Sequence, residues 1–297
     1  FIDHKLMEVL EIADRITVLR QGRTVATVNA DEVTAADLAE LMVGSELPTP
    51  DTTESTVTDT VALAVRNVTV VEHDRPVVED VSFEIRQGEI LGIAGVEGNG
   101  QTELIGAIIG TERMAGGSIH LFDDDITRWS VRQRREAGIA YVPQDRHEEG
   151  LLINAPLWEN AALGHQTKRP YSKGPWIDRQ GSRAQTEAIR DQFNVKTPNV
   201  EVAPYALSGG NQQKLIIGRE MTSNPQLLVA AHPTRGIDVG AQAAVWQSIR
   251  DARSLGLATL LISADLDELI GLSDTIAVMY LGRLVAMLDP ATITPRE

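Results

Sequence analysis

The sequence predicts an α/β fold with a largely parallel sheet, preceded by an antiparallel β portion. Short apolar runs of the kind that form buried parallel strands alternate with helix-like segments, which is the pattern of this class. The runs lie at 90–94, 138–142, 227–231 and 259–263. Ahead of them, residues 81–85 alternate apolar and polar side chains, as a half-exposed strand does.

Composition limits the possible functions. The 297 residues include no cysteine, so neither a disulfide framework nor a thiolate metal site is possible. The apolar runs are far shorter than the roughly 20 residues that span a bilayer, so any membrane part would belong to another chain. The formal charge of −15 opposes broad binding to nucleic acid, although backbone amides can still hold a small phosphate ligand.

The two ends of the chain repeat each other at a constant offset of 260 residues, since residues 1–26 align without a gap with 261–286. Ten positions meet an identical residue in the second copy: Ile2, Leu6, Glu8, Asp14, Ile16, Val18, Gly22, Arg23, Val25 and Ala26. Each copy has the pattern of a strand end, an amphipathic helix and a hairpin. Chance convergence of two such segments is the alternative to a duplicated domain, which we favour.

The repeat predicts the domain organisation. Residues 1–46 are expected to be the C-terminal end of a first copy, and residues 61–297 most of a second. Residues 47–60 are expected to be a linker, because Thr, Asp, Ser and Pro dominate there without an apolar period. Since residues 38–43 have no counterpart after Glu297, we expect the chain to be a fragment of a longer protein.

A glycine-rich loop follows the strand expected at 90–94. Its spacing is that of the P-loop, G-x-x-x-x-G-K-[ST], between a strand and a helix, where backbone N–H groups surround a phosphate. Gln101 stands in place of the lysine, and a neutral amide cannot neutralise phosphate charge. A plain glycine-rich turn is the alternative. The candidate phosphate-binding residues are Gly95, Gly98, Asn99, Gly100, Gln101 and Thr102.

A second motif, LSGGNQQK at 207–214, precedes a predicted helix with Ser208 in the N-cap position. This is the ABC signature, and the sequence closely resembles the tandem two-cassette ATP-binding subunits of ABC importers for sugars and nucleosides. A simple Ser-Gly-Gly helix cap is the alternative. The resemblance implies a P-loop NTPase cassette with a parallel-sheet core, an antiparallel β subdomain and a helical subdomain. That helical subdomain, at about 148–206, touches the membrane subunit in the family.

The resemblance also assigns the remaining motifs. Residues 141–146 match the Q-loop, and Gln144 would approach the nucleotide. Thr102 and Gln144 would also be ligands of Mg²⁺, weakened or lost here. Residues 227–238 match the Walker B and D-loop segment.

In that segment the family has an Asp-Glu pair, which holds Mg²⁺ and polarises the attacking water. This chain has Ala231 and His232 instead, and Ala264 stands where the family has its switch histidine. His232 alone is a conceivable base, but it has neither a metal ligand nor a lysine beside it. Together with Gln101, these three positions would line a single degenerate site.

In this family two cassettes pair head to tail, so each ATP lies between the P-loop of one cassette and the signature helix of the other. By resemblance, Ser208, Gly209, Gly210 and Gln212 would therefore act catalytically at the site of the first cassette. His4, which aligns with Ala264, would be the switch histidine of that site, or else an ordinary strand-end histidine. ATP and Mg²⁺ are the expected cofactors there.

The resemblance thus predicts an ABC-type ATPase that energises import of a nucleoside or simple sugar and is inactive or nearly so as this fragment. It implies a peripheral protein on the cytoplasmic face of the membrane. The expected partners are transmembrane permease subunits, the first cassette and, indirectly, an extracytoplasmic solute-binding protein. No nucleic acid is expected. The alternatives are a non-transport ABC ATPase of the translation or DNA-repair type, and a cassette that no longer binds nucleotide.

Overall fold

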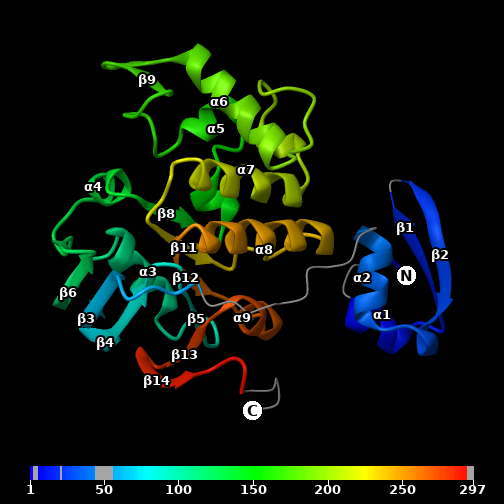
Figure 1. Cartoon of the computed structure of the whole chain (residues 1–297), viewed down its shortest axis with the longest axis horizontal. Coiled ribbons are helices and arrows are strands. Elements are labelled where there is room, and N and C mark those ends of the chain that lie inside the picture. The colour runs from blue at the N-terminus through cyan, green and yellow to red at the C-terminus, as the bar shows by residue number, and fades with distance from the viewer. Residues whose placement is uncertain (3–5, 21, 44–55, 293–297) are drawn as a thin grey trace.

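The computed structural model of the chain describes residues 1–2, 6–20, 22–43 and 56–292. They form a small N-terminal unit and a larger unit that begins at β3 (Figure 1). The small unit contains α1 (Leu6–Ile12), β1 (Arg15–Arg20), β2 (Arg23–Asn29), a 3₁₀ turn (Ala30–Glu32) and α2 (Ala35–Val43). The strands of the larger unit are β3 (Val61–Glu72), β4 (Arg75–Arg86), β5 (Ile90–Ala94), β6 (Met114–Leu121), β7 (Asp124–Asp125), β8 (Ile139–Val142), β9 (Ser172–Lys173), β10 (Trp176–Ile177), β11 (Leu227–Ala231), β12 (Ala258–Ile262), β13 (Thr275–Tyr280) and β14 (Arg283–Leu288).

The helices of the larger unit are α3 (Gln101–Ile109), α4 (Val131–Glu136), α5 (Leu157–Ala162), α6 (Arg179–Gln192), α7 (Gly209–Met221), α8 (Val239–Ser254) and α9 (Leu266–Leu272). A π-helical turn lies at Arg146–Gly150 and a 3₁₀ turn at Pro204–Ala206. None of the helices in the described residues combines the length and apolar character needed to cross a bilayer.

The main sheet of the described residues has six strands in the order β14-β13-β5-β12-β11-β8. All run parallel except β14, which pairs antiparallel with β13. The expected α/β architecture with a parallel core is therefore confirmed. Because β5 lies between β13 and β12, the loop after it emerges at the carboxyl edge of the sheet, where sheets of this kind bind ligands.

Alternate residues of the buried strands contribute to two cores. In β11, Leu227, Val229 and Ala231 join a core with α3 and the antiparallel sheet, whereas Leu228 and Ala230 join a core with α7, α8 and α9. A strand covered on both faces has an uninterrupted apolar sequence, which explains why the pattern located β5 and β11 with their observed bounds.

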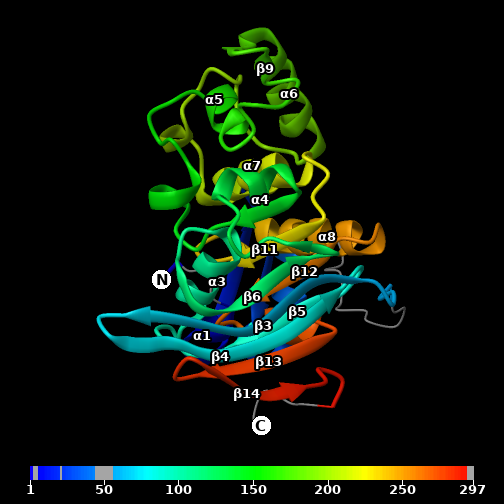
Figure 2. The same ribbon diagram turned by 90° about the vertical axis from the view of Figure 1, so that its left-hand side faces the viewer.

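The antiparallel β portion is a separate sheet of the described residues, in the order β4-β3-β6-β7, which lies across the lower part of the larger unit (Figure 2). On the opposite side, α5 and α6 pack against each other and against α7. Together with α7, these helices of the segment expected to be the helical subdomain form a helical layer. It also carries a short hairpin, β9–β10, that the sequence analysis did not anticipate.

The small unit repeats the end of the larger one. Its α1, β1 and β2 begin at Leu6, Arg15 and Arg23, and α9, β13 and β14 begin at Leu266, Thr275 and Arg283, so the offset of 260 residues holds for every element. Both hairpins also have a register shift at the equivalent place, after Val18 and after Val278. Pairing differs, because β13 joins β5 in the main sheet whereas β1, among the described residues, pairs with β2 alone.

Candidate functional site

The glycine-rich loop lies between β5 and α3, as the spacing predicted. Gly98 and Gly100 have φ values of +90° and +102°, the left-handed conformation that glycine adopts without strain. A Cβ on Gly100 would lie 2.5 Å from the carbonyl oxygen of Val77, so no larger residue fits. The loop is fastened to the β13–β14 turn, where the N–H of Leu281 donates to Asn99 Oδ1 (2.8 Å) and the N–H of Gly282 to the Asn99 carbonyl (2.9 Å).

The side chain of Gln101 folds back onto this loop. Its Oε1 accepts the N–H of Asn99 (3.1 Å), and its Nε2 donates to the carbonyl of Val96 (3.2 Å). Only 7% of the residue is exposed. Both ends of the amide are therefore hydrogen-bonded within the loop that was predicted to hold a phosphate.

The rim of the loop is acidic. The exposed Glu97 accepts a hydrogen bond from Gln144 Nε2 (2.7 Å), and the guanidinium of Arg235 lies 3.7 Å from the same carboxylate. Gln144, expected to approach the nucleotide, thus lies beside the loop but binds a carboxylate. Glu97 thus lies at the rim of the loop in contact with both Gln144 and Arg235.

His232 bridges the ends of β11 and β12. Its backbone N–H donates to the carbonyl of Ile262 (2.7 Å), and its Nδ1 accepts the N–H of Ala264 (3.3 Å). The two positions at which the resemblance expects catalytic residues are therefore joined by a hydrogen bond. Burial, and to a lesser degree the charge of Arg235, lowers the pKa of His232, so the ring is neutral near pH 7.

These residues do not fit a complex of ATP with Mg²⁺. Ala231, at the position where the resemblance places a metal-binding carboxylate, is apolar and fully buried. Thr102, the expected hydroxyl ligand, is exposed on the first turn of α3. No group of three His, Asp or Glu side chains in the described part of the chain is placed to hold a metal ion. The Gln101 amide is hydrogen-bonded to the backbone of Asn99 and Val96 in the loop expected to hold a phosphate.

The signature residues form a second group, at the N-terminus of α7. Ser208 occupies the N-cap position and is exposed, but its hydroxyl makes no capping hydrogen bond within the described residues. Instead it accepts a hydrogen bond from Asn211 Nδ2 (2.9 Å), and Asn211 Oδ1 accepts the N–H of Lys196 (2.7 Å). The first N–H groups of α7, on Gly209 and Gly210, have no partner within the helix and form its positive end; Gly209 is half-buried and Gly210 is buried.

Arg146 connects the signature residues on α7 with the segment after β11 that lies beside the phosphate loop. Its Nε donates to Gln212 Oε1 (3.1 Å) on α7, and its Nη1 donates to the carbonyl of Arg235 (2.9 Å) in the segment after β11. Gln212 is buried, lies 3.0 Å from His147 Nε2 and donates to the carbonyl of Pro204 (2.9 Å). Arg146 is the last residue of the 141–146 segment that matches the Q-loop, and nothing in the sequence pattern predicts these contacts.

A buried ionic cluster fixes α7 to the edge of the main sheet. The carboxylate of Glu220, which is 0% exposed, accepts from Arg219 Nε (2.8 Å), Arg135 Nη2 (2.9 Å) and the N–H of Tyr141 (3.3 Å). Arg219 also donates to the carbonyl of Gly150 (2.8 Å). The cluster therefore holds the signature helix against both ends of the segment that contains Gln144.

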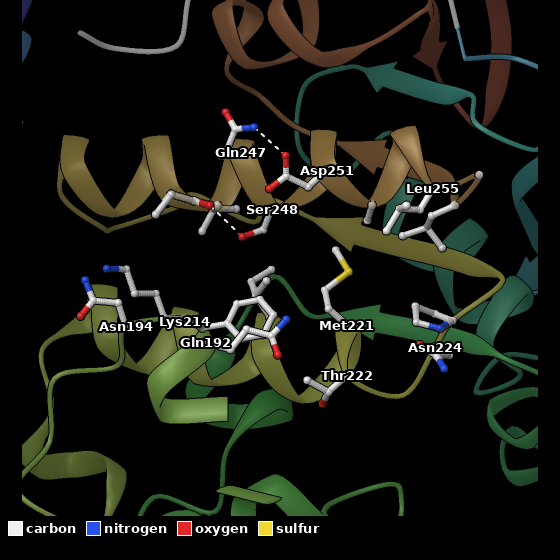
Figure 3. A pocket seen from close by; sticks show the side chains of 18 of the residues that line it. Gln192, Asn194, Lys214, Met221, Thr222, Asn224, Gln247, Ser248, Asp251 and Leu255 are labelled. Atoms are coloured by element: carbon white, nitrogen blue, oxygen red, sulfur yellow. Dashed lines mark hydrogen bonds between the residues drawn. The ribbon is translucent and has the colours of Figure 1, made fainter. Parts of the chain in front are cut away.

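A groove of about 960 Å³ lies apart from both groups, between α7 and α8 (Figure 3). Its walls include Lys214 and Met221 on one side and Gln247, Asp251 and Leu255 on the other. Of the predicted site residues that the structure describes, none lines it. His4, the remaining predicted site residue, lies outside the described residues.

Comparison with known proteins gives a consistent result. The family model described as "ABC transporter" matches residues 78–235. Similar solved structures include a nucleotide-free ATP-binding cassette from an ABC transporter, with a TM-score of 0.67 and 22% identity over 77% of this chain and 91% of that one. Another is a dimeric cassette bound to ADP and phosphate, with a TM-score of 0.67 and 18% identity over 77% of this chain and 98% of that one. At these identities the likeness establishes the fold.

Curated relatives are more similar in sequence. The nucleoside import ATP-binding protein of Lactococcus lactis is 39% identical over 100% of this chain and 59% of its own length. The glucose import ATP-binding protein of Haloferax volcanii is 40% identical over 98% of this chain and 53% of its own length. The chain thus spans little more than half the length of these relatives.

Proposed function

The chain belongs to the ABC transporter family, and on this premise we propose that it is an ATP-binding component of a system that imports a small solute. Its own phosphate loop is the degenerate site of a cassette pair. Its signature residues complete the competent site of the other cassette. These residues are Ser208, Gly209, Gly210 and Gln212.

One observation carries this proposal: the contrast between the two groups of site residues. The phosphate loop has an internal amide in its cradle, an acidic rim and an apolar Ala231 in place of a metal ligand. The N-terminus of α7, by contrast, is exposed at Ser208 and held in place through Gln212 and Arg146. This contrast supports a role for the signature residues at a site other than the phosphate loop of the same cassette.

We propose the domain division that the repeat predicts: residues 1–46 as the end of a first cassette, 47–60 as linker and 61–297 as the present cassette, with a helical subdomain at about 148–206. Residues 44–55, which include most of the linker, lie outside the described residues. The support is the repeat of helix, hairpin and register shift at the constant offset of 260 residues. His4 is proposed as the switch histidine of the first cassette because it aligns with Ala264.

At the competent site, the first cassette would hold most of the nucleotide and its Mg²⁺, which supplies charge neutralisation at the phosphates. The part of this chain is to present the positive end of α7, with the N–H groups of Gly209 and Gly210 and the hydroxyl of Ser208, toward the terminal phosphate. Gln212 would position that turn, because it is buried and hydrogen-bonded at both ends of its amide.

The names of the relatives support the proposed cargo class, since they describe nucleoside and sugar import. We propose that the chain acts at the cytoplasmic face of the membrane, with permease subunits and a first cassette as direct partners and an extracytoplasmic solute-binding protein as an indirect one. The net charge of −15 supports the absence of a nucleic-acid partner.

Steady-state ATP hydrolysis tests the proposal. The chain by itself should show turnover no higher than the background of a sample without protein, because no complete site is present. In the tandem protein proposed here, Ser208→Ala and His4→Ala should each reduce turnover by at least about 100-fold, the loss typical of removing a group that stabilises the transition state.

His232→Ala is the matched control, because His232 lies in the degenerate site and should leave turnover within about twofold of the wild type. Robust hydrolysis by the chain alone would refute the proposal. So would the opposite ranking of variants, in which His232→Ala abolishes turnover and Ser208→Ala does not.

A further inference from the structure

We propose that Gln101 acts as an internal ligand of its own phosphate loop, so that its amide keeps nucleotide out of the degenerate site. This inference rests on the proposed function, because it explains how the degenerate site is kept silent. It differs from the idea that glutamine is a weak substitute for the lysine of the motif. In that case the amide would help to bind phosphate, whereas here it competes with phosphate.

The position of the side chain supports competition. The Asn99 N–H, one of the backbone donors expected to face a phosphate, donates to Gln101 Oε1 (3.1 Å). The other end of the amide donates to the carbonyl of Val96 (3.2 Å). A Cβ built on Gly95 would lie 2.5 Å from Gln101 Nε2, so the amide lies directly over the start of the loop. The side chain therefore crosses the cradle from one side to the other.

The chemistry of the two residue types explains why this occurs with glutamine. A lysine ammonium has three donors and no acceptor, so it cannot accept the N–H of Asn99 and leaves it available to a phosphate. A glutamine amide has both a donor and an acceptor, and satisfies an N–H and a carbonyl of the loop together. Replacement of lysine by Gln101 thus removes a positive charge and also adds an acceptor that occupies a phosphate donor.

The loop does not depend on Gln101 for its shape. Asn99 Nδ2 also donates to the carbonyl of Val96 (2.8 Å), and Asn99 Oδ1 accepts the N–H of Leu281 (2.8 Å) from the β13–β14 turn. These contacts fix both ends of the turn without the glutamine. The variant Gln101→Ala should therefore keep the loop folded and leave its cradle open.

Calorimetric titration of the chain with ATP and Mg²⁺, and with inorganic pyrophosphate, separates the two ideas. Gln101→Ala should bind pyrophosphate about tenfold more tightly than the wild type, which corresponds to release of about one net hydrogen bond. Gln101→Lys should bind at least as tightly as Gln101→Ala. The control Gln247→Ala, which makes the same change on the exposed face of α8, should bind like the wild type.

The inference is overturned if Gln101→Ala binds pyrophosphate no more tightly than the wild type. It is also overturned if neither Gln101→Ala nor the wild type binds pyrophosphate. Amide hydrogen exchange gives an independent measurement on the same samples. The Asn99 amide should exchange at least about tenfold faster in Gln101→Ala, since its acceptor is gone. The Gly110 amide, which donates to the carbonyl of Gly106 (2.8 Å), should be unchanged. Unchanged exchange at Asn99 also overturns the inference.

These measurements concern the loop of this chain alone. The proposed function is tested by turnover at the site that Ser208 completes. If Gln101→Ala gains no affinity while Ser208→Ala still abolishes turnover, the internal-ligand inference fails and the composite site stands. If Gln101→Ala gains affinity but the Ser208 and His232 variants rank in the opposite order, the composite site fails and the internal ligand stands.

Discussion

Replacing Glu220 with glutamine tests the buried ionic cluster that holds the signature helix. The carboxylate is 0% exposed and lies between Arg219 (2.8 Å) and Arg135 (2.9 Å). Glu220→Gln keeps the shape of the side chain but leaves two guanidinium groups, both largely buried, without their counter-charge. Breaking a buried pair in this way costs about 3–5 kcal/mol of unfolding free energy. For a unit of this size, that lowers the melting temperature by roughly 6–20 °C.

Thermal unfolding followed by circular dichroism at pH 7 measures this loss. Glu84→Gln is the control, because the Arg66–Glu84 pair (3.9 Å) is about half exposed and such pairs contribute about 0–1 kcal/mol. If Glu220→Gln melts within about 2 °C of the wild type, the cluster does not stabilise the chain and the account of how α7 is held is wrong.

The same cluster predicts that the stability of the protein depends on pH. Burial alone would raise the pKa of Glu220, but the charges of Arg219 and Arg135 outweigh it and hold the pKa below its ordinary value. The stabilisation is therefore present above about pH 4.3, where an unfolded glutamate ionises, and is lost as the pH falls through the folded pKa. The difference between wild type and Glu220→Gln should accordingly shrink in denaturation curves taken below pH 4.

Two further predictions concern buried titratable groups. Burial raises the pKa of Glu268, whose Oε1 accepts hydrogen bonds from Thr234 and Trp246 (2.8 Å each). The free energy of unfolding should therefore fall as the pH rises through the pKa of this residue in the folded state. Glu268→Gln, which keeps the acceptor without the charge, should have a larger free energy of unfolding than the wild type in urea at pH 7, and the difference should shrink toward pH 4. Lower stability of the variant at pH 7 contradicts this. Burial also lowers the pKa of His165 to about 4, so up to about 3 kcal/mol of stability should disappear as the pH falls from 6.5 to 4. His165→Gln should flatten that profile, and an unchanged slope counts against the assignment.

The strands and the glycine-rich loop could be predicted because their causes are local. A strand buried on both faces must be apolar throughout, so 90–94 and 227–231 coincide with β5 and β11. The strand expected at 259–263 begins and ends one residue earlier, as β12, because strand ends depend on pairing with neighbours. The repeat between the two ends is likewise visible in the sequence alone.

The order of motifs can be read from the chain alone, as can Gln101 and Ala231 at the positions where the family motifs have a lysine and a carboxylate. What the remaining side chains contact depends on the folded arrangement. Asn99 lies only two residues before Gln101 in the chain. Arg146 and Arg235 are far apart in sequence, as are Glu97 and Gln144, and their contacts arise where separate loops meet at the edge of the sheet. A hydrogen bond depends on the positions of both partners in space, and the spacing of residues along a chain does not specify these positions for long-range pairs.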